Sequence, residues 1–479
     1  MASTDLYSSL SKQFGADKVF KPDDTLKYFT AQSCAQIPAI HVLPESAEDV
    51  SIIIKTATEH QQPFAVKSGG HGVFAGASSI SGGLLIDLAR INKTEVADDR
   101  KSAWIGAGAK WGSVYEALNN HGLSIPGGRI SSVGVGGLTL GGGISFAANR
   151  YGLACDNVKS YEVVLASGEI IQVTTESHPD LFFALRGAGT NFGVVTRFQF
   201  VAFEQTQIWG GVKQYFGEDQ VVTLLDKFCH DQALDSEVAD IYAEAFVIVA
   251  YVQPLQKYIT TAVLSHGATT DNPPVFEGFN RLQPFQSSTK VRSVADLCIE
   301  LNANNPHGLR SKVLNFSVTG DAEILLKVIS IYREALIQHK DKVKNFVPAL
   351  LIQPLLPRML PDDEGSHTLG VSKKDGPLYI ICLLWSWTEV CDDELAIQIA
   401  YDIRDKAKAA ASSAGRLHRY VYLNYADSDQ DVFASYGESN LKTLLEVSKK
   451  YDPNQIFTRL RPGYIKVARS AQAKESACA

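Results

Sequence analysis

Apolar residues at helical spacing mark the first clear element of the chain. Val50, Ile53 and Ile54 recur three and four positions apart, as on the buried face of an amphipathic helix. Ser46 and Asp49 stand where an N-cap serine and its reciprocal partner belong. The pattern therefore predicts a helix that begins after Ser46.

Further along, short apolar runs alternate with glycine-rich turns from residue 38 to 203, which favours strands joined by tight loops. The predicted strands and hairpins are 63–66, 84–88, 96–105, 161–173 and 192–200, with short helices at 111–120 and 179–185.

After residue 204 glycine becomes less frequent, and longer elements are predicted: buried strands at 246–251 and 379–387 and helices at 322–338 and 394–412. The pattern becomes compact again near 415, with a tyrosine-rich segment at 420–425 and a helix near 436–450. These changes predict boundaries near 204 and 415.

The composition is that of a globular protein with more than one domain. The chain has 479 residues, 45% hydrophobic and 20% charged, too long for one ordinary core. The net charge of −7 argues against nucleic acid as a partner. No apolar run could span a bilayer and the start does not resemble a secretion signal, so we expect a cytoplasmic protein with no membrane partner. The seven cysteines are dispersed without a C-x-x-C pair, which favours reduced thiols.

Two glycine-dense segments carry the candidate chemistry. They are Lys67-Ser68-Gly69-Gly70-His71-Gly72 and the run from Gly127 to Gly143. Glycine lets backbone N–H groups come close to a bound group, and clustered N–H groups cradle phosphates. Glycines that merely serve tight turns are the alternative. Two such segments, with Gly187-Ala-Gly-Thr-Asn-Phe-Gly193 in the same unit, favour a phosphate-bearing cofactor with His71 beside its reactive part.

Other cofactor and catalytic sites lack their local patterns. Gly134-Val-Gly-Gly-Leu-Thr-Leu-Gly has the wrong spacing for a Rossmann fingerprint, and the hairpins around it do not form a βαβ unit. The sequence contains no H-E-x-x-H, P-loop or G-x-S-x-G motif. We therefore expect neither a nicotinamide cofactor on a Rossmann domain nor a metal.

Six motifs in order resemble the berberine-bridge-enzyme-like branch of the vanillyl-alcohol-oxidase flavoproteins, from about residue 38 to 465. They are Val66-Lys-Ser-Gly-Gly-His71; Pro126-Gly-Gly with Val133-Gly-Val-Gly-Gly and Gly141-Gly-Gly; Tyr151-Gly-Leu-Ala-Cys-Asp-Asn157; Leu185-Arg-Gly-Ala-Gly; Tyr422-Leu-Asn424-Tyr425; and Tyr451-Asp-Pro-Asn.

The resemblance implies an α+β fold: a PCMH-type FAD-binding domain of two subdomains, with an inserted α/β substrate domain built on an antiparallel sheet. The implied ranges are 1–203 for the FAD-binding domain (core about 38–203), 204–415 for the substrate domain and 416–479 for a C-terminal segment that returns to the flavin. The residues implied around FAD are Lys67, Ser68, Gly69, Gly70, His71, Gly72, Gly76, Ser132, Gly134, Gly137, Thr139, Gly142, Gly143, Asn157, Gly193, Val195 and Asn424.

Three positions carry specific implied roles. His71 matches the histidine that bonds the flavin 8α-methyl carbon. Many relatives add a second bond through a cysteine, but this chain has Ile130 at that place, so we expect a single covalent link. Val133 stands where an aliphatic residue controls oxygen access, and valine there resembles the oxidase pattern. An ordinary core valine is the alternative.

Proton transfer is assigned to Tyr422, which matches an activated tyrosine of several relatives. A free tyrosine has a pKa of about 10, so a nearby cation would have to lower it. The alternative is that Tyr422 is a core aromatic of a strand. Substrate contacts are expected from Tyr379, Trp385 and Gln353, and more weakly from Phe246, His307 and Arg310.

Together these features predict a flavin-linked oxidase that converts a small, aromatic or polyketide-like alcohol of secondary metabolism, with O2 as acceptor and H2O2 as product. The first alternative is a flavin-bearing cyclase or isomerase with no net oxidation. The second is a non-catalytic binding protein on the same fold.

Overall fold

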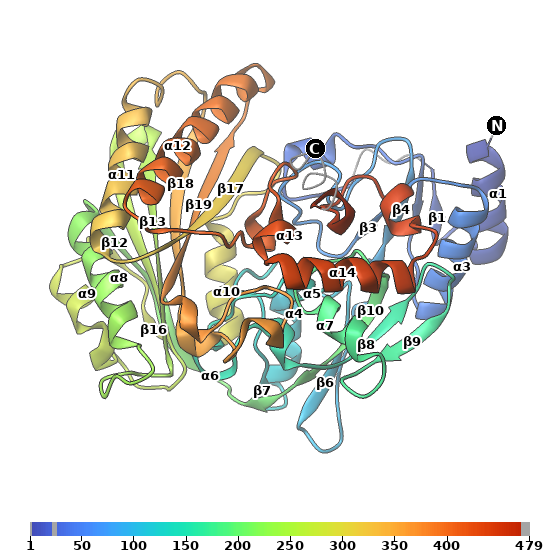
Figure 1. Cartoon of the computed structure of the whole chain (residues 1–479), viewed down its shortest axis with the longest axis horizontal. Helices are drawn as coiled ribbons and strands as arrows, with labels where there is room; N and C mark the ends of the chain where they lie inside the picture. The colour runs from blue at the N-terminus through green and yellow to red at the C-terminus, as the bar shows by residue number, and fades with distance from the viewer. Residues whose placement is uncertain (1, 22–25, 471–479) are drawn as a thin grey trace.

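A four-stranded sheet begins the fold in the computed structural model, which describes residues 2–21 and 26–470 (Figure 1). Its order is β1-β2-β4-β3, where β4 is parallel to β2 and β3 while β1 is antiparallel to β2. The strands are β1 (Val19–Phe20), β2 (Ile40–Val42), β3 (Phe64–Lys67) and β4 (Leu84–Asp87). The strand predicted at 63–66 is β3, and it runs directly into the first glycine segment.

A five-stranded antiparallel sheet follows, in the order β5-β6-β10-β8-β9. Both predicted hairpins are confirmed: β5 pairs with β6 and β8 pairs with β9. The strands are β5 (Thr94–Val96), β6 (Ser102–Gly106), β8 (Val158–Val164), β9 (Ile170–Val173) and β10 (Val194–Val201), and a separate pair joins β7 (Leu123–Ser124) to β11 (Phe203–Glu204).

A nine-stranded antiparallel sheet dominates the second half of the chain. Its order is β15-β12-β14-β13-β18-β19-β17-β20, with β16 also paired to β12. The strands are β12 (Ile208–Phe216), β13 (Ala243–Val252), β14 (Lys257–His266), β15 (Gln286–Ser287), β16 (Lys290–Arg292), β17 (Arg310–Thr319), β18 (Val347–Leu355), β19 (Leu378–Trp387) and β20 (Leu417–His418). Sheet membership thus changes close to residues 204 and 415, although the division into domains remains a prediction.

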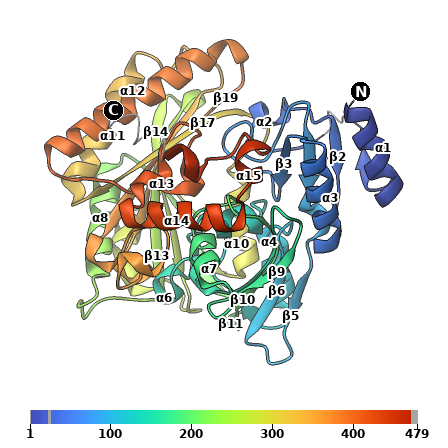
Figure 2. The same ribbon diagram turned by 45° about the vertical axis from the view of Figure 1, so that its right-hand side comes forward.

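Three long helices, α8, α11 and α12, cover the outer face of the nine-stranded sheet, and α14 crosses the middle of the molecule (Figures 1 and 2). The helices are α1 (Ala2–Phe14), α2 (Ala31–Cys34), α3 (Ala47–Glu59), α4 (Trp111–Asn119), α5 (Val135–Leu140), α6 (Ala148–Tyr151), α7 (Pro179–Leu185), α8 (Asp219–Asp231), α9 (Glu277–Arg281), α10 (Val294–Ala303), α11 (Ala322–Ile337), α12 (Asp393–Ser413), α13 (Val432–Ser435), α14 (Glu438–Tyr451) and α15 (Ile456–Arg459).

The predicted start of α3 at Ser46 is confirmed, but the Asp49 side chain bonds the residue before the cap and not Ser46 itself. Ser46 Oγ accepts a hydrogen bond from Asp49 N at 3.2 Å, while Asp49 Oδ2 accepts one from Glu45 N at 2.9 Å. Val50 and Ile53 are fully buried on the inner face. Cap and apolar stripe therefore agree, which is why the sequence specified this helix well.

Two segments differ from the sequence-based interpretation. The second glycine segment is not one loop, because α5 (Val135–Leu140) forms inside it despite Gly136 and Gly137. The tyrosine-rich segment 420–425 is not a strand but ends in a 3₁₀ turn at Leu423–Tyr425. The α+β class itself is confirmed.

Within the described residues, the six cysteines present are all free, while Cys478 lies outside them. The same residues include no helix with the length and apolar character that crossing a bilayer requires. They also include no group of three or more His, Cys, Asp or Glu side chains placed to bind a metal ion.

A buried carboxyl group joins the nine-stranded sheet to the N-terminal region. Glu244 of β13 is 7% exposed, and its Oε1 accepts a hydrogen bond from Asn149 N of α6 at 2.7 Å. Burial raises the pKa of Glu244 to about 8, against smaller lowering effects of the Asn149 N–H, Arg129 and Arg150. The folded protein therefore holds a proton at neutral pH that the unfolded chain releases.

This proton predicts a pH-dependent stability. Between pH 4.5 and 8 the folded state binds one proton more than the unfolded state, so the free energy of unfolding falls as pH rises, by up to about 1.4 kcal/mol per pH unit. Glu244→Gln removes this titration and keeps an oxygen acceptor for Asn149. In urea denaturation, we expect the free energy of unfolding of the variant, relative to that of wild type, to rise by roughly 2–4 kcal/mol from pH 5 to pH 8. The exposed Glu116→Gln serves as control, and a Glu244→Gln difference that is the same at both pH values would contradict the assignment.

Candidate active site

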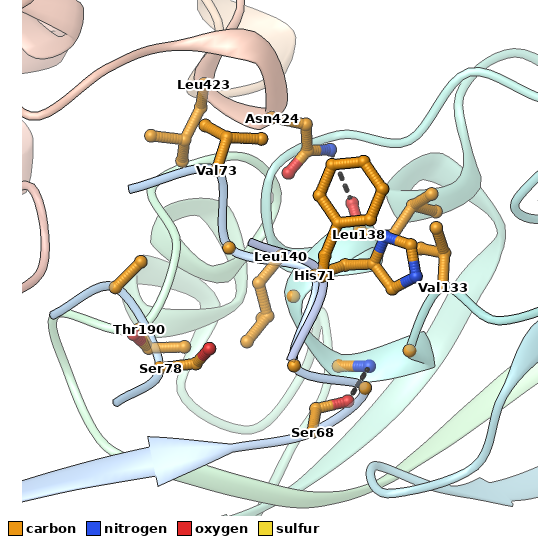
Figure 3. A pocket seen from close by; sticks show the side chains of 18 of the residues that line it. Ser68, His71, Val73, Ser78, Val133, Leu138, Leu140, Thr190, Leu423 and Asn424 are labelled. Carbon is orange, nitrogen blue, oxygen red and sulfur yellow. Dashed lines mark hydrogen bonds between the residues drawn. The ribbon is translucent and has the colours of Figure 1, made fainter. Parts of the chain in front are cut away.

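A cavity of about 340 Å³ lies between the glycine-rich segments and one face of the nine-stranded sheet. The charged side chains in its wall are Arg129 and Arg461, and none of the residues that line it is Asp or Glu. Figure 3 shows part of this wall. The lining includes residues 68–74, 136–138, 193–195 and 422–426, and from the sheet Phe246, Ile248, Val313, Leu351 and Leu384.

The two glycine segments touch each other through their backbones at the floor of this cavity. Ser68 Oγ donates to Ala107 O at 2.6 Å and accepts from Gly136 N at 3.3 Å (Figure 3). A Cβ on Gly69 would lie 2.3 Å from Gly134 N, so neither segment tolerates a side chain at the crossing. The prediction that both segments build one site is consistent with this contact.

Gly137 faces the cavity itself. A Cβ built on it meets nothing within 4 Å, and the residue lines the cavity, so a side chain there would take up space that a bound group needs. Gly142 and Gly143 have φ of 103° and 85°, which only glycine adopts readily, and they turn the chain after α5. Glycine thus serves two purposes here: open space at Gly137 and a left-handed turn at 142–143.

His71 is enclosed by aromatic rings. Its imidazole stacks on Phe29 with ring centroids 4.7 Å apart and meets His307 edge-on at 4.9 Å. Burial, assisted by the neighbouring charges of His307 and Lys110, lowers the pKa of His71 to about 3. The ring is therefore neutral at physiological pH, and one of its nitrogens carries a lone pair.

The hydrogen bonds of Ser132 show which ring nitrogen of His71 carries the proton and which carries the lone pair. Its hydroxyl has one proton, which it donates to Asn302 Oδ1. Ser132 Oγ therefore accepts from His71 Nε2, 2.7 Å away, so Nε2 carries the imidazole proton. His307 Nε2 also lies 3.1 Å from the same oxygen. The lone pair of His71 is then on Nδ1.

Tyr422 lies in the cavity wall with two donors on its hydroxyl oxygen. Gly143 N donates to Tyr422 Oη at 3.2 Å and Asn424 Nδ2 donates to it at 3.0 Å. Asn424 is itself held by Leu138 O at 2.9 Å, as Figure 3 shows. Burial raises the pKa of Tyr422, and Asn424, Arg129 and the Gly143 N–H act against that rise. The hydroxyl proton is left free to point at a bound molecule.

Arg129 is a cavity residue that the sequence-based reasoning did not single out. Its Nη2 donates to Tyr425 Oη at 3.1 Å, and its guanidinium lies 4.4 Å from the centre of the Phe246 ring. It is the cation that acts on Tyr422. Arg419, three residues before Tyr422 in the sequence, pairs with Glu364 instead. The signal in the sequence that could have identified Arg129 is its position inside the second glycine segment, between Gly128 and Ile130.

Arg461 supplies the second positive charge. It is 3% exposed, and Nη1 donates to Thr190 O at 2.8 Å and also to Thr190 Oγ1. Its Nε, like Ser78 Oγ, is buried without a hydrogen-bond partner among the described residues, and burial lowers its pKa to about 10. No carboxylate of the described residues forms an ion pair with it. A buried unpaired cation beside unsatisfied polar atoms fits the anionic diphosphate of a dinucleotide such as FAD.

Most of the predicted cofactor residues line the cavity, and Val133 and Tyr422 do so as well. Those in the lining are Ser68, Gly69, Gly70, His71, Gly72, Gly134, Gly137, Gly193, Val195 and Asn424. Ser132, Gly142 and Gly143 lie behind it and position His71 and Tyr422.

Four predicted cofactor residues lie outside the lining, and three of them have structural partners. Lys67 Nζ forms an ion pair with Asp87 at 2.8 Å, which anchors the start of the first segment. Gly76 packs against Gly463, and Asn157 Nδ2 bonds the carbonyl of Tyr151 at 2.7 Å. Thr139 is fully buried in α5. None of the four lines the cavity.

The predicted substrate contacts need correction. Tyr379 and Trp385 share a face of β19, as alternation predicts, but it is the face under the helices: Tyr379 Oη bonds Asp226 of α8 at 2.5 Å. Leu384 of the opposite face lines the cavity. Gln353 is 1% exposed and does not line it.

Among the weaker candidates, Phe246 lines the cavity and His307 lies on His71. Arg310 pairs with Asp393 at the start of α12 and does not belong to the lining. The side of the cavity that faces the nine-stranded sheet is formed by Phe246 and aliphatic residues.

The chain is similar to known FAD-binding proteins. Residues 38–174 match the family model described as an FAD binding domain, and residues 421–459 match the model described as berberine and berberine like. FAD-dependent monooxygenase tpcD of Cochliobolus heterostrophus is 35% identical over 92% of this chain and 87% of its own length. FAD-dependent monooxygenase sdcF of Emericella nidulans is 36% identical over 90% and 91%.

Solved structures share the fold. Berberine bridge enzyme from Eschscholzia californica superposes with a TM-score of 0.77 at 19% identity, covering 96% of this chain and 98% of that one. 6-Hydroxy-D-nicotine oxidase from Arthrobacter nicotinovorans gives 0.76 at 22% identity, covering 92% and 96%. The chain belongs to the berberine-bridge-enzyme-like family of FAD-dependent oxidoreductases.

Proposed function

We propose that this protein is an FAD-linked oxidase that converts a hydroxyl group of a small, flat organic molecule of secondary metabolism to a carbonyl, with dioxygen as acceptor and hydrogen peroxide as product. The observation that carries the proposal is Tyr422 in the cavity wall, its oxygen held by two N–H donors. When bound, the flavin supplies a two-electron acceptor that dioxygen reoxidises. The protein's own contributions are proton transfer, orientation and exclusion of water.

The deprotonated form of Tyr422 takes the proton of the substrate hydroxyl. Removal of that proton leaves negative charge on the substrate oxygen, and the Tyr422 oxygen must be an acceptor at that moment. Burial raises the pKa of Tyr422, and the Gly143 and Asn424 donors and the charge of Arg129 act against that rise by stabilising negative charge on Tyr422 Oη. The aliphatic wall of Ile248 and Leu384 keeps water from competing for the proton.

We further propose that FAD is attached once, through His71 Nδ1. His71 is neutral, its proton is held on Nε2 by Ser132, and the remaining lone pair is nucleophilic. Ile130 lines the cavity at the place of a second link. None of the cysteines in the described chain lines the cavity. A single bond is therefore what these residues support.

Val133 is proposed to set access of oxygen. It lines the cavity, is half-buried, and directly follows Ser132, whose hydroxyl oxygen lies 2.7 Å from His71 Nε2. The size of the side chain at position 133 would set the width of the path by which oxygen reaches the flavin. A larger aliphatic side chain would narrow that path.

The names of the relatives favour a second candidate function, that of a monooxygenase. Turnover under ¹⁸O2 distinguishes an oxidase from a monooxygenase. With a panel of aromatic alcohols that includes 4-hydroxybenzyl alcohol, we expect one peroxide per carbonyl formed, with both ¹⁸O atoms in the peroxide. Val133→Leu should slow reoxidation of the reduced protein without changing the product. One ¹⁸O atom in the organic product would identify a monooxygenase, and conversion without oxygen uptake would identify the cyclase or isomerase alternative.

A further inference from the structure

The positive charge of Arg129 is not explained by the cofactor. Arg461 lies beside Thr190 and Ser78, where an anionic diphosphate fits. Arg129 contacts different residues, Tyr425 and Phe246, and Phe246 belongs to the substrate-side sheet. The wall around it is apolar, with Ile248, Val313, Leu351 and Leu384 from the same sheet.

The backbone holds Arg129 in this position. Gly127 and Gly128 press against Trp111, since a Cβ on either would lie 2.0 Å and 2.3 Å from atoms of its ring. Cys298 Sγ donates to Gly128 O at 3.6 Å. The chain is therefore fixed directly before Arg129, and the guanidinium rests on the Phe246 ring at 4.4 Å.

No carboxylate of the described residues forms an ion pair with Arg129. Glu244 is on the same strand as Phe246 and feels the arginine charge, but burial raises its pKa to about 8, so it is protonated at neutral pH. Its Oε1 is already used by Asn149 N. A guanidinium in an apolar wall without a counter-charge is unfavourable until an anion arrives.

Tyr425 completes a pair of donors. Its oxygen accepts from Arg129 Nη2, so its own hydroxyl proton is free to donate. The Tyr425 ring meets the Tyr422 ring edge-on with centroids 4.9 Å apart. A group bound by Arg129 and Tyr425 is therefore close to the proposed proton acceptor.

We propose that Arg129 and Tyr425 bind an anionic oxygen of the substrate, a carboxylate or an acidic phenol or enol, carried on a flat apolar body that packs against Ile248, Leu351 and Leu384. This inference rests on the proposed function, because it names the class of molecule that the same site converts: aromatic or conjugated alcohols that also carry an acidic group, in preference to alcohols or amines without one. Arg129 orients the substrate and so acts as a specificity residue.

Ligand binding to the protein with its flavin tests the site without turnover. Benzoate and its neutral isostere benzamide probe a carboxylate, and 4-nitrophenolate against nitrobenzene probes an acidic phenol, each followed through the flavin absorbance and by calorimetry. We expect wild type to prefer one or both anions over the neutral partner by at least about tenfold. Arg129→Gln should weaken binding of the preferred anion by about 10- to 100-fold and binding of its neutral partner by less than about threefold.

Matched variants keep the test decisive. Arg150 also lies over aromatic rings, 4.9 Å from that of Tyr242, but does not line the cavity, so Arg150→Gln should retain the anion preference. Tyr425→Phe, which keeps the ring, should weaken the anion about threefold to tenfold. Equal binding of both anions and their neutral partners to wild type, or an unchanged preference in Arg129→Gln, would overturn the proposal. If wild type keeps the anion preference but forms no labelled peroxide in the ¹⁸O experiment, only the proposed oxidase function is rejected.

Discussion

Replacing Tyr422 with phenylalanine is expected to lower kcat by about 10²- to 10⁴-fold, the range that a positioned general base contributes. The substitution removes only Oη, the atom that receives the Gly143 and Asn424 hydrogen bonds at 3.2 and 3.0 Å. Because Tyr422 is a buried part of the wall, the ring of phenylalanine keeps the shape of the cavity. Substrate binding, which depends on that shape, should change far less than kcat.

The pH profile distinguishes a base from a packing residue. Burial raises the pKa of Tyr422, so the fraction that can accept a proton grows as pH increases, and the wild-type rate should rise with pH. Tyr422→Phe should lose this dependence. Tyr420→Phe is the control, because Tyr420 is equally buried two residues earlier but does not line the cavity. If Tyr422→Phe kept the wild-type rate within threefold and the same pH profile, Tyr422 would not be the base.

Replacing His71 with alanine is expected to abolish covalent attachment of the flavin. The imidazole of His71 is neutral because burial lowers its pKa to about 3, and Ser132 holds its proton on Nε2. No other cavity residue offers a comparable nucleophile, since Ile130 occupies the second position. Acid precipitation should therefore leave the yellow colour with wild-type protein and release it to the supernatant from His71→Ala.

The same ring predicts how attachment depends on pH. A histidine with a pKa of about 3 stays neutral from pH 8 to pH 5, so loading of apoprotein with FAD should be equally complete across this range. An ordinary histidine, with a pKa near 6.5, would lose its lone pair to protonation toward pH 5. His121→Ala, at an exposed position, should retain the bound flavin and controls for nonspecific effects of replacing a histidine.

Local signals in the sequence were sufficient for several secondary-structure elements of the N-terminal half. Ser46 with its apolar stripe predicted α3, and turn residues predicted both hairpins, because cap, turn and periodicity agree there. The helix cap lies within four residues of α3, and each hairpin turn joins strands that are adjacent in sequence. These features depend on neighbours in sequence, so sequence reasoning reaches them.

The substrate side depends on contacts between distant segments. Alternation on β19 separates Tyr379 and Trp385 from Leu384, but both faces of this sheet are buried, one under helices and one against the cavity. Hydrophobic pattern alone does not say which face is which. Arg129 was overlooked for a related reason: its role arises from Phe246 and Tyr425, more than a hundred residues away. α5 was missed because glycines lower helix propensity, and tertiary packing overrides that here.

Peptide mass analysis of the acid-denatured wild-type protein tests whether this cavity holds a flavin tethered by one histidine. We expect the peptide that contains His71 to carry the mass of one FAD, fragmentation to place that mass on the imidazole, and the peptide that contains Ile130 to be unmodified. An unmodified His71 peptide from protein that released its flavin on denaturation, or a flavin found on any other residue, would contradict this expectation.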